Sequence, residues 1–170
     1  QSEQLSDFNC RDLNGQTLLQ RMARSCKPWL VRILQLLPEA QHFPVVCAQD
    51  HWGETVLHKA VYRDDESERT DSYYHDCHAT IKNIITLLPE YQRSQAVNMK
   101  DKFGCTVLHR AASSGHSRLI APILKLLPES QRSEAVHIGD ACGRTVLQYM
   151  DTGSRNSIIN WLSEKSSNKR

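Results

Sequence analysis

One phrase, Asp-x-x-Gly-x-Thr-(Val/Leu)-Leu, occurs four times along the chain and constrains its fold more than any other feature. The copies are Asp12–Leu19, Asp50–Leu57, Asp101–Leu108 and Asp140–Leu147. A second phrase, Leu-Leu-Pro-Glu, follows each of the first three copies. Self-similarity of this kind is typical of chains that stack one small supersecondary unit on the next. We therefore expect a stack of four similar units.

The spacing of the motif glycines indicates that one unit is longer than the others. From Gly15 through Gly53 and Gly104 to Gly143, the intervals are 38, 51 and 39 residues. The additional residues fall in the segment 62–78, which carries six acidic residues and two arginines. We interpret this segment as an acidic insertion in the second unit, which leaves the rest of the chain basic.

Each unit is expected to contain two helices. In the third unit, Thr106 is a capping-type residue before a short helix of small apolar residues, and apolar residues at helical spacing from Leu119 to Leu127 predict a second helix. The Asp-x-x-Gly phrase predicts a tight turn between units, with glycine at positive φ and aspartate as a side-chain acceptor. The proline of Leu-Leu-Pro-Glu either ends the second helix or opens a further short one.

These elements define one expected domain, 8–163, followed by a polar tail, 164–170. The units lie near 8–46, 47–97, 98–136 and 137–163.

The composition is that of an ordinary water-soluble domain, with 39% hydrophobic and 24% charged residues. A formal charge of +2 is too small to indicate nucleic-acid binding. No apolar stretch approaches the roughly 20 residues that cross a bilayer, and the polar opening is no signal peptide. We therefore expect a cytosolic monomer with neither a nucleic-acid nor a membrane partner.

The six cysteines form no Cys-x-x-Cys pair, and a chain of this length needs no disulfide. We expect free thiols in a reducing compartment, with three disulfides as the alternative.

The run Gly104–His116 closely resembles the ankyrin repeat, whose signature is Gly-x-Thr-Pro-Leu-His-x-Ala-Ala-x-x-Gly-His. Gly53–Ala60 is nearly as close, whereas the first and fourth units have Gln20 and Gln148 in place of the motif histidine. Val or Leu replaces the motif proline, and the units exceed the usual length of about 33 residues. The resemblance implies an all-α ankyrin-repeat solenoid of about four helix-turn-helix units with extended connections, covering roughly 8–163.

The longer connections, with their Leu-Leu-Pro-Glu, x-Gln-Arg and Ala-Val pattern, are similar to those of ankyrin proteins that intracellular bacteria deliver into host cells. This resemblance implies a virulence effector that is secreted into the host cytoplasm and recognises a host protein. The alternative is a substrate-recognition domain of a larger enzyme whose catalytic domain lies outside this chain.

No arrangement of residues predicts catalysis. His58 and His109 occupy the motif position that in ankyrin proteins is similar to a structural hydrogen-bonding position, and the glutamines of the other units could bond there but could not replace a catalytic imidazole. Nothing marks Cys105 as an activated nucleophile beside His116. We therefore expect no enzyme activity in this chain.

The densest group of metal ligands is His75-Asp76-Cys77-His78. Ligands this close in sequence do not easily share one tetrahedral zinc site. We expect an exposed polar loop there, with zinc binding as the alternative, and neither a metal nor another cofactor.

Large aromatic residues at the turn tips are the best candidates for partner contacts, because such positions face water. Trp52 follows His51 on the second tip, and Phe103 follows Lys102 on the third. The alternative is that the two rings pack on adjoining tips.

Positions on the inner helix that ankyrin proteins vary to bind partners are also candidates, and here they include Arg24, Tyr62, Arg63, Ser113 and Ser114. Two other tryptophans, Trp29 and Trp161, stand among aliphatic residues at helical spacing and are expected in the core. The sequence thus predicts non-catalytic binding of a protein on a concave face of tips and inner helices, with the acidic insertion adding a lateral contact or excluding wrong partners.

Overall fold

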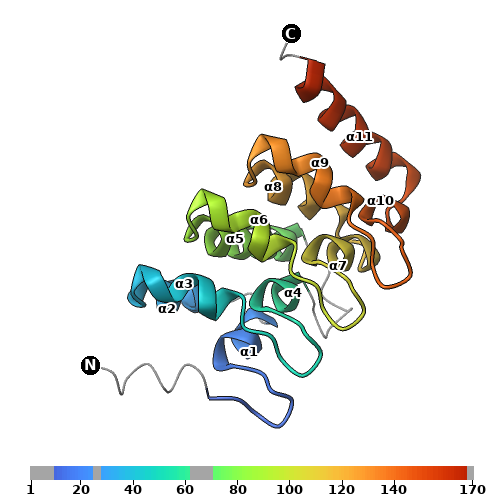
Figure 1. Ribbon diagram of the computed structural model, residues 1–170. Helices are drawn as coiled ribbons and strands as arrows, with labels where there is room; N and C mark the ends of the chain where they lie inside the picture. Colours follow the sequence, from blue (N-terminus) through green and yellow to red (C-terminus); the bar gives the residue numbers. More distant parts are fainter. Residues whose placement is uncertain (1–9, 25–27, 62–70, 168–170) are drawn as a thin grey trace.

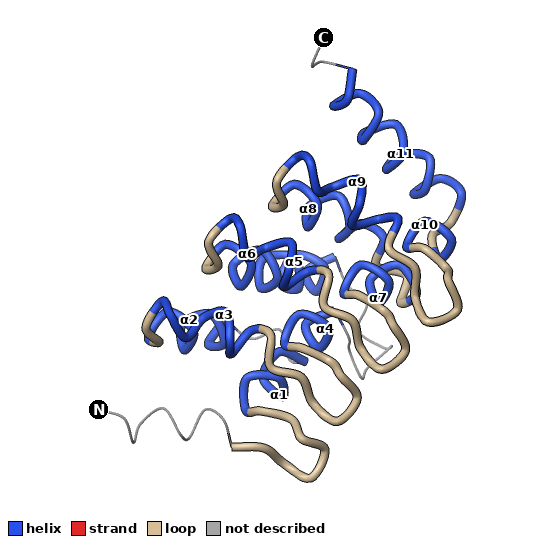
Figure 2. Tube along the Cα trace, in the orientation of Figure 1, coloured by secondary structure: helices blue, strands red, loops and turns tan. Residues whose placement is uncertain are grey.

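The computed structural model describes residues 10–24, 28–61 and 71–167. Within these ranges helices are the only regular secondary structure, apart from two isolated antiparallel bridges (Figure 2). The expected all-α class is therefore confirmed.

Three classes of helix follow one another in an order that repeats along the chain (Figure 1). The inner helices, each directly after a turn tip, are α1 (Leu18–Arg24), α4 (Val56–Val61), α7 (Val107–Ser113) and α10 (Val146–Tyr149). The middle helices are α2 (Pro28–Leu36), α5 (Asp71–Thr86) and α8 (Ile120–Lys125), the last preceded by the 3-10 helix η4 (Ser117–Leu119). The third helices are α3 (Glu39–Val46), α6 (Glu90–Val97) and α9 (Glu129–His137). Helices of one class pack on the next of the same class, so that each tip with the helices after it forms one layer of a stack. The long helix α11 (Thr152–Ser167) ends the described chain.

The third helices answer a question that the sequence left open. Each begins directly after the proline of Leu-Leu-Pro-Glu, at Pro38, Pro89 and Pro128, where the fixed φ of proline suits the residue before a helix. The glutamate that follows lies in the first turn, where the helix dipole favours a negative charge. The first three layers therefore contain three helices each, rather than the two expected, and much of the extended connection is helical.

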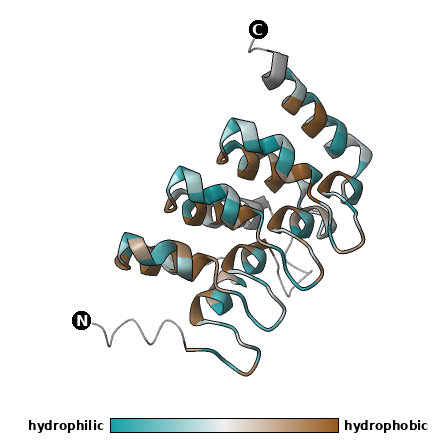
Figure 3. Cartoon of the chain, viewed as in Figure 1, coloured by the Kyte–Doolittle hydropathy of each residue, from teal (hydrophilic) through white to brown (hydrophobic). Residues whose placement is uncertain are grey.

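The core runs along the stack where the layers meet. Its largest fully buried side chains include Leu30 and Leu34 of α2, Ile84 of α5 and Ile123 of α8. In Figure 3 hydrophobic stretches follow the helices where layers meet, whereas α6 and α9 present mostly hydrophilic residues. The aliphatic periodicity of the middle helices thus makes one continuous core.

Trp29 does not belong to this core, and the expectation that it does is wrong, because its side chain is 61% exposed. Its counterparts in the next two layers, Thr80 and Leu119, are only 4% and 3% exposed. Helix α2 packs against one side of α5, and α5 packs against the same side of α8, whereas no described helix precedes α2 on that side. The side chain of Trp29 is therefore left uncovered. Trp161 is half-buried in α11 and packs against the core, as expected.

Two segments differ in extent from their sequence interpretation. Helix α5 begins at Asp71, so the end of the acidic segment 62–78 is helical, while 62–70 lies outside the described residues. Helix α11 extends to Ser167, so residues 164–167, which were predicted to belong to a polar tail, are helical. Among the helices that the structure describes, none has both the length and the apolar character needed to traverse a bilayer. The five described cysteines form no disulfide with one another.

Candidate functional site

Four turn tips lie side by side along one edge of the stack, and the motif aspartate and glycine shape each one (Figures 1 and 2). In the third tip, Oδ1 of Asp101 accepts hydrogen bonds from the backbone N–H groups of Phe103 (2.8 Å) and Cys105 (2.9 Å). Gly104 adopts a positive φ of 73°. The other three tips repeat both features, so the expected roles of aspartate and glycine are confirmed.

Backbone hydrogen bonds join each tip to the next. The N–H of Lys102 donates to the carbonyl of Trp52 at 2.9 Å, and equivalent bonds join His51 to Asn14 and Ala141 to Phe103, each at 3.0 Å. The side chain of Gln49 also reaches across, with Nε2 donating to the carbonyl of Lys100 at 2.9 Å. The tips therefore form a continuous, hydrogen-bonded row.

The motif histidine links one layer to the next beneath this row. Nδ1 of His58 accepts a hydrogen bond from the backbone N–H of Thr55 at 3.2 Å. The ring proton therefore lies on Nε2, which donates to the carbonyl of Cys105 in the following tip at 3.0 Å. Burial, which disfavours the charged ring, lowers the pKa of His58. The ring is thus a neutral structural link.

The same link recurs in the other layers. His109 donates to the carbonyl of Arg144 at 3.1 Å, and burial lowers its pKa as well. In the first layer, Gln20 takes the place of the histidine and donates through Nε2 to the carbonyls of Ala48 (2.8 Å) and Glu54 (2.7 Å). The expectation that these positions are hydrogen-bonding ones is confirmed, including the ability of glutamine to serve there.

A buried ionic network, which the sequence analysis missed, lies under the two central tips. Nζ of Lys59 is 2.7 Å from Oδ2 of Asp50, and Nε of Arg110 donates to Oδ2 of Asp101 at 2.8 Å. Glu54 connects the two pairs, because one carboxylate oxygen contacts Lys59 and the other lies 3.3 Å from Arg110. The two inner helices and their tips are thus held by one chain of charges.

A signal for this network was present in the sequence. The residue nine positions after each motif aspartate is a cation or a tyrosine: Arg21, Lys59, Arg110 and Tyr149. In the fourth layer the hydroxyl of Tyr149 donates to Oδ2 of Asp140 at 2.6 Å. Burial and this bond raise the pKa of Tyr149 to about 12, and the same bond lowers that of Asp140. In the second, third and fourth layers the pair joins a tip to its own inner helix.

The partners of Asp50 in the network favour its ionised form. Burial alone would raise the pKa of Asp50, but the Lys59 ammonium and the N–H groups of Glu54 and Trp52 lower it below its usual value. These charged groups have their partners within the protein. They hold the tips against the inner helices.

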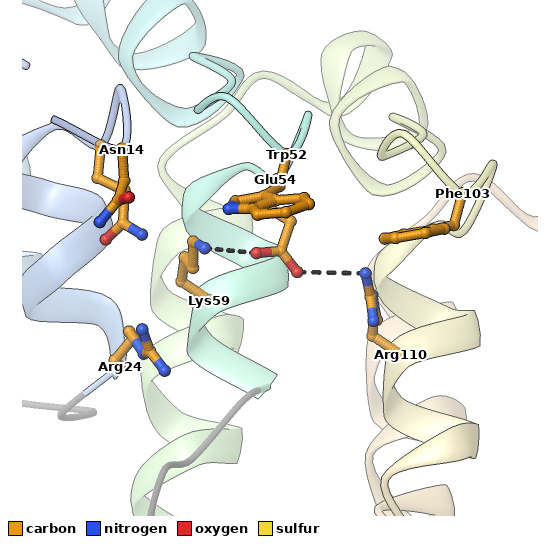
Figure 4. Close-up of a pocket in the computed structure, with 8 residues that line it drawn as sticks. Asn14, Arg24, Trp52, Glu54, Lys59, Phe103 and Arg110 are labelled. Atoms are coloured by element: carbon orange, nitrogen blue, oxygen red, sulfur yellow. Dashed lines mark hydrogen bonds and ion pairs between the residues drawn. The ribbon is translucent and has the colours of Figure 1, made fainter.

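A groove of about 340 Å³ opens above this network, between the tips and the inner helices (Figure 4). Its lining residues are Asn14, Gln16, Arg24, Trp52, Glu54, Lys59, Phe103 and Arg110. Trp52 is 53% exposed and Phe103 is 55% exposed. Nζ of Lys102 lies 6.0 Å from the ring centre of Trp52, and the guanidinium of Arg110 lies 5.7 Å from that of Phe103. Each ring thus has a cation beside it.

The structure brings together some of the predicted partner-binding residues. Trp52, Phe103 and Arg24 line the groove, and His51 and Lys102 are exposed on the same two tips. Ser113 is exposed and Ser114 half-buried at the end of α7, apart from the described lining. Tyr62 and Arg63 lie outside the described residues. The lining residues that the sequence analysis missed are Asn14, Gln16, Glu54, Lys59 and Arg110, of which the last two follow the nine-residue spacing.

No group of three or more histidine, cysteine, aspartate or glutamate side chains is arranged to hold a metal ion within the described part of the chain. The expectation of an exposed polar loop at 75–78 is wrong, because these residues lie within helix α5 and Cys77 is buried; the side chains of His75 and Asp76 lie outside the described part. Neither a protein-family model nor a curated protein matches this sequence.

Proposed function

We propose that this chain is an ankyrin-type solenoid of four units that binds a partner protein, without catalysis, in the groove between its tips and inner helices. One observation carries the proposal: two large aromatic side chains, Trp52 and Phe103, stand about half exposed on neighbouring tips at the edge of one groove. Exposed aromatics beside a groove are typical anchors of protein interfaces.

The rigidity of the surroundings supports a binding role. The tips are joined by backbone hydrogen bonds, and the floor of the groove is fixed by the ion pairs of Glu54 with Lys59 and Arg110. A surface that is already ordered loses little conformational entropy when a partner binds. The two rings are therefore presented in positions that a partner need not reorganise.

The anchors are large enough to matter energetically. An aromatic side chain that is about half exposed can bury on the order of 100 Å² more in an interface. At about 25 cal/mol per Å² this burial contributes roughly 2.5 kcal/mol, which corresponds to a change in affinity of tens of fold. Loss of either ring is therefore expected to be measurable.

The state of the titratable groups supports a non-catalytic role. Glu54, Lys59 and Arg110 are engaged with one another, and the buried Asp101 is paired with Arg110. General acid–base catalysis needs a group that can exchange a proton with a bound substrate. Ion pairs that hold the tips in place are not suited to that task.

The class of partner follows from the second resemblance. The Leu-Leu-Pro-Glu connections are similar to those of ankyrin proteins that intracellular bacteria deliver into host cells, and we propose a host protein as the partner. The domain would then direct an effector to its target in the host cytoplasm.

The proposal is tested by affinity capture from a eukaryotic cell lysate with quantitative mass spectrometry. The immobilised parent chain is compared with Trp52→Ala and Phe103→Ala, and with the control variants Trp29→Ala and Tyr91→Ala. The controls remove aromatics that are at least as exposed but do not line the groove. We expect partners that the parent and both controls retain and that both tip variants lose. Equal retention by all five proteins would contradict a tip-centred binding site.

A further inference from the structure

Every exposed Asp, Glu, Lys or Arg residue on the groove side of the described chain is a cation. We define the groove-side segments as 10–24, 47–61, 98–114 and 137–149, which hold the tips and inner helices. Their exposed charged residues are Arg11, Arg21, Lys100, Lys102 and Arg144. Their acidic residues, Asp12, Asp50, Glu54, Asp101 and Asp140, are all buried or half-buried.

The acids are withdrawn because the fold uses them. Oδ1 of each motif aspartate accepts two backbone N–H bonds of its tip. Oδ2 of Asp50 forms an ion pair with Lys59 of the inner helix, and Oδ2 of Asp101 and of Asp140 accepts a hydrogen bond from Arg110 and Tyr149. Both oxygens of Glu54 are occupied by Lys59 and Arg110. A partner approaching the tips therefore meets cations, while the negative charges lie behind them.

The opposite distribution holds on the third helices. Each begins with a glutamate that is exposed: Glu39, Glu90 and Glu129. The described surface is therefore polarised, with exposed acids on the third helices and only cations exposed on the groove-side segments. Surface potentials of one sign attract partners of the other sign and select against like-charged ones.

Resting on the proposed function, we propose that the groove binds an acidic segment of its partner, in which carboxylates stand next to a large apolar side chain. The apolar side chain packs between Trp52 and Phe103. A neighbouring carboxylate pairs with the exposed Lys102, whose Nζ lies 6.0 Å from the Trp52 ring. The side-chain amide of Asn14, on the next tip, can hydrogen-bond to the peptide backbone of the bound segment.

A nucleic acid is the other polymer that a cationic face can attract, but the groove favours a peptide. The floor carries the carboxylate of Glu54, whose side chain is 13% exposed, so the group that enters the groove itself should be uncharged, as an apolar side chain is and a phosphate is not. Proteins that follow a nucleic-acid backbone neutralise many successive phosphates with lysine and arginine. Here the lining cations Lys59 and Arg110 are already paired internally.

The test begins with a selection from a random-peptide display library on the immobilised parent chain. Selected peptides are synthesised with a fluorescent label, and their affinities are measured by anisotropy at low and high salt. The variants are Trp52→Ala, Lys102→Glu and the matched control Lys125→Glu. Lys125 is also exposed and lies 6.0 Å from a tryptophan ring, that of Trp161, outside the groove-side segments. A labelled single-stranded oligonucleotide is titrated in parallel.

We expect the selected peptides to be acidic and to contain a large apolar residue. Their binding should be lost in Trp52→Ala, weakened about tenfold by Lys102→Glu and weakened at high salt, and unchanged by Lys125→Glu. Neutral or basic peptides that still depend on Trp52 would overturn the acidic partner and leave the proposed function standing. If no peptide is selected, or if binding is independent of Trp52, both proposals fail. Trp52-dependent binding of the oligonucleotide that is tighter than that of every peptide would replace the peptide by a nucleic acid.

Discussion

Replacing His58 with alanine or with glutamine separates the hydrogen-bonding role of the motif histidine from any other role. The ring accepts from Thr55 and donates to Cys105 in the next tip, and it is fully buried. Alanine removes both bonds. Glutamine is expected to restore them, because Gln20 makes the equivalent pair of bonds in the first layer, accepting from Thr17 at 2.7 Å.

The size of the effect follows from the groups left behind. In His58→Ala a buried N–H and a buried carbonyl lose their partner, at about 1–3 kcal/mol each. The deleted ring also leaves a cavity, so the loss in the free energy of unfolding is expected to be about 3–5 kcal/mol. His58→Gln keeps the bonds with somewhat altered packing and is expected to cost about 1 kcal/mol.

Urea unfolding followed by circular dichroism measures these differences, with the midpoint compared at an unchanged slope. A destabilisation by His58→Gln that equals that of His58→Ala would refute the reasoning, since it would mean that shape rather than hydrogen bonding determines the contribution of this position. A loss in the free energy of unfolding below about 1 kcal/mol in His58→Ala would also refute the hydrogen-bonding role, because leaving buried polar groups without a partner costs more than that.

The stability of the parent chain and that of His58→Gln are expected to depend differently on pH. Burial lowers the pKa of His58 in the folded state below the ordinary value of about 6.5 that applies to the unfolded chain. Below that value the unfolded state binds the additional proton, so stability falls as the pH decreases toward the folded pKa and is unaffected above it. Between about pH 7 and pH 5, the parent should lose more stability than His58→Gln, and equal losses would contradict the assignment.

Three further experiments test the stack at other points. A Cβ on Gly104 would lie 2.4 Å from the backbone nitrogen of Ala141, whereas a Cβ on Gly143 would meet nothing within 4 Å. Both Gly104→Ala and Gly143→Ala carry the cost of a positive φ, about 1–2 kcal/mol. Because only Gly104→Ala also creates a clash, thermal unfolding should show it to be the more destabilising of the two. Trp29→Ser should change stability by less than about 0.5 kcal/mol, whereas Ile84→Ala, in the buried core of the next layer, should cost about 2–5 kcal/mol in urea unfolding. Burial raises the pKa of the Cys47 thiol to about 11, so mass spectrometry should find it alkylated at neutral pH more slowly than the exposed cysteines.

The sequence predicted those features of the fold and the site that depend on neighbours within a few residues. The turn at each tip follows from the aspartate and the glycine that build it, because the acceptor and the positive-φ residue lie within the same four residues. The capping threonine and the residue three positions later behave likewise, which is why Gln20 could be expected to serve in place of the histidine. The third helices were only partly predicted, because a proline can end one helix or precede another, although the polar run after it favoured a further helical turn.

The candidate site is formed by residues that lie farther apart in the sequence than the length of one motif, so the motifs alone did not predict it. The tip aromatics were found because a tip must face water. Lys59 and Arg110 were missed, since a cation nine residues from an aspartate becomes its partner only if the inner helix turns back beneath the tip. The groove itself is lined by residues of three successive layers, so no single unit could have indicated it.

By itself the sequence determined the all-α class, the fourfold order and the local chemistry of each tip, because these depend on short-range spacing and backbone geometry. Only the tertiary structure decided which equivalent residues are buried and which charges face outward. Trp29 is exposed whereas Thr80 and Leu119 are buried, because the exposure of a side chain depends on whether a neighbouring layer covers it and not on the residue type alone. In the same way Asp50, Asp101 and Asp140 are buried by the inner helices that pair with them, so the exposed charged residues of the groove-side segments are cationic.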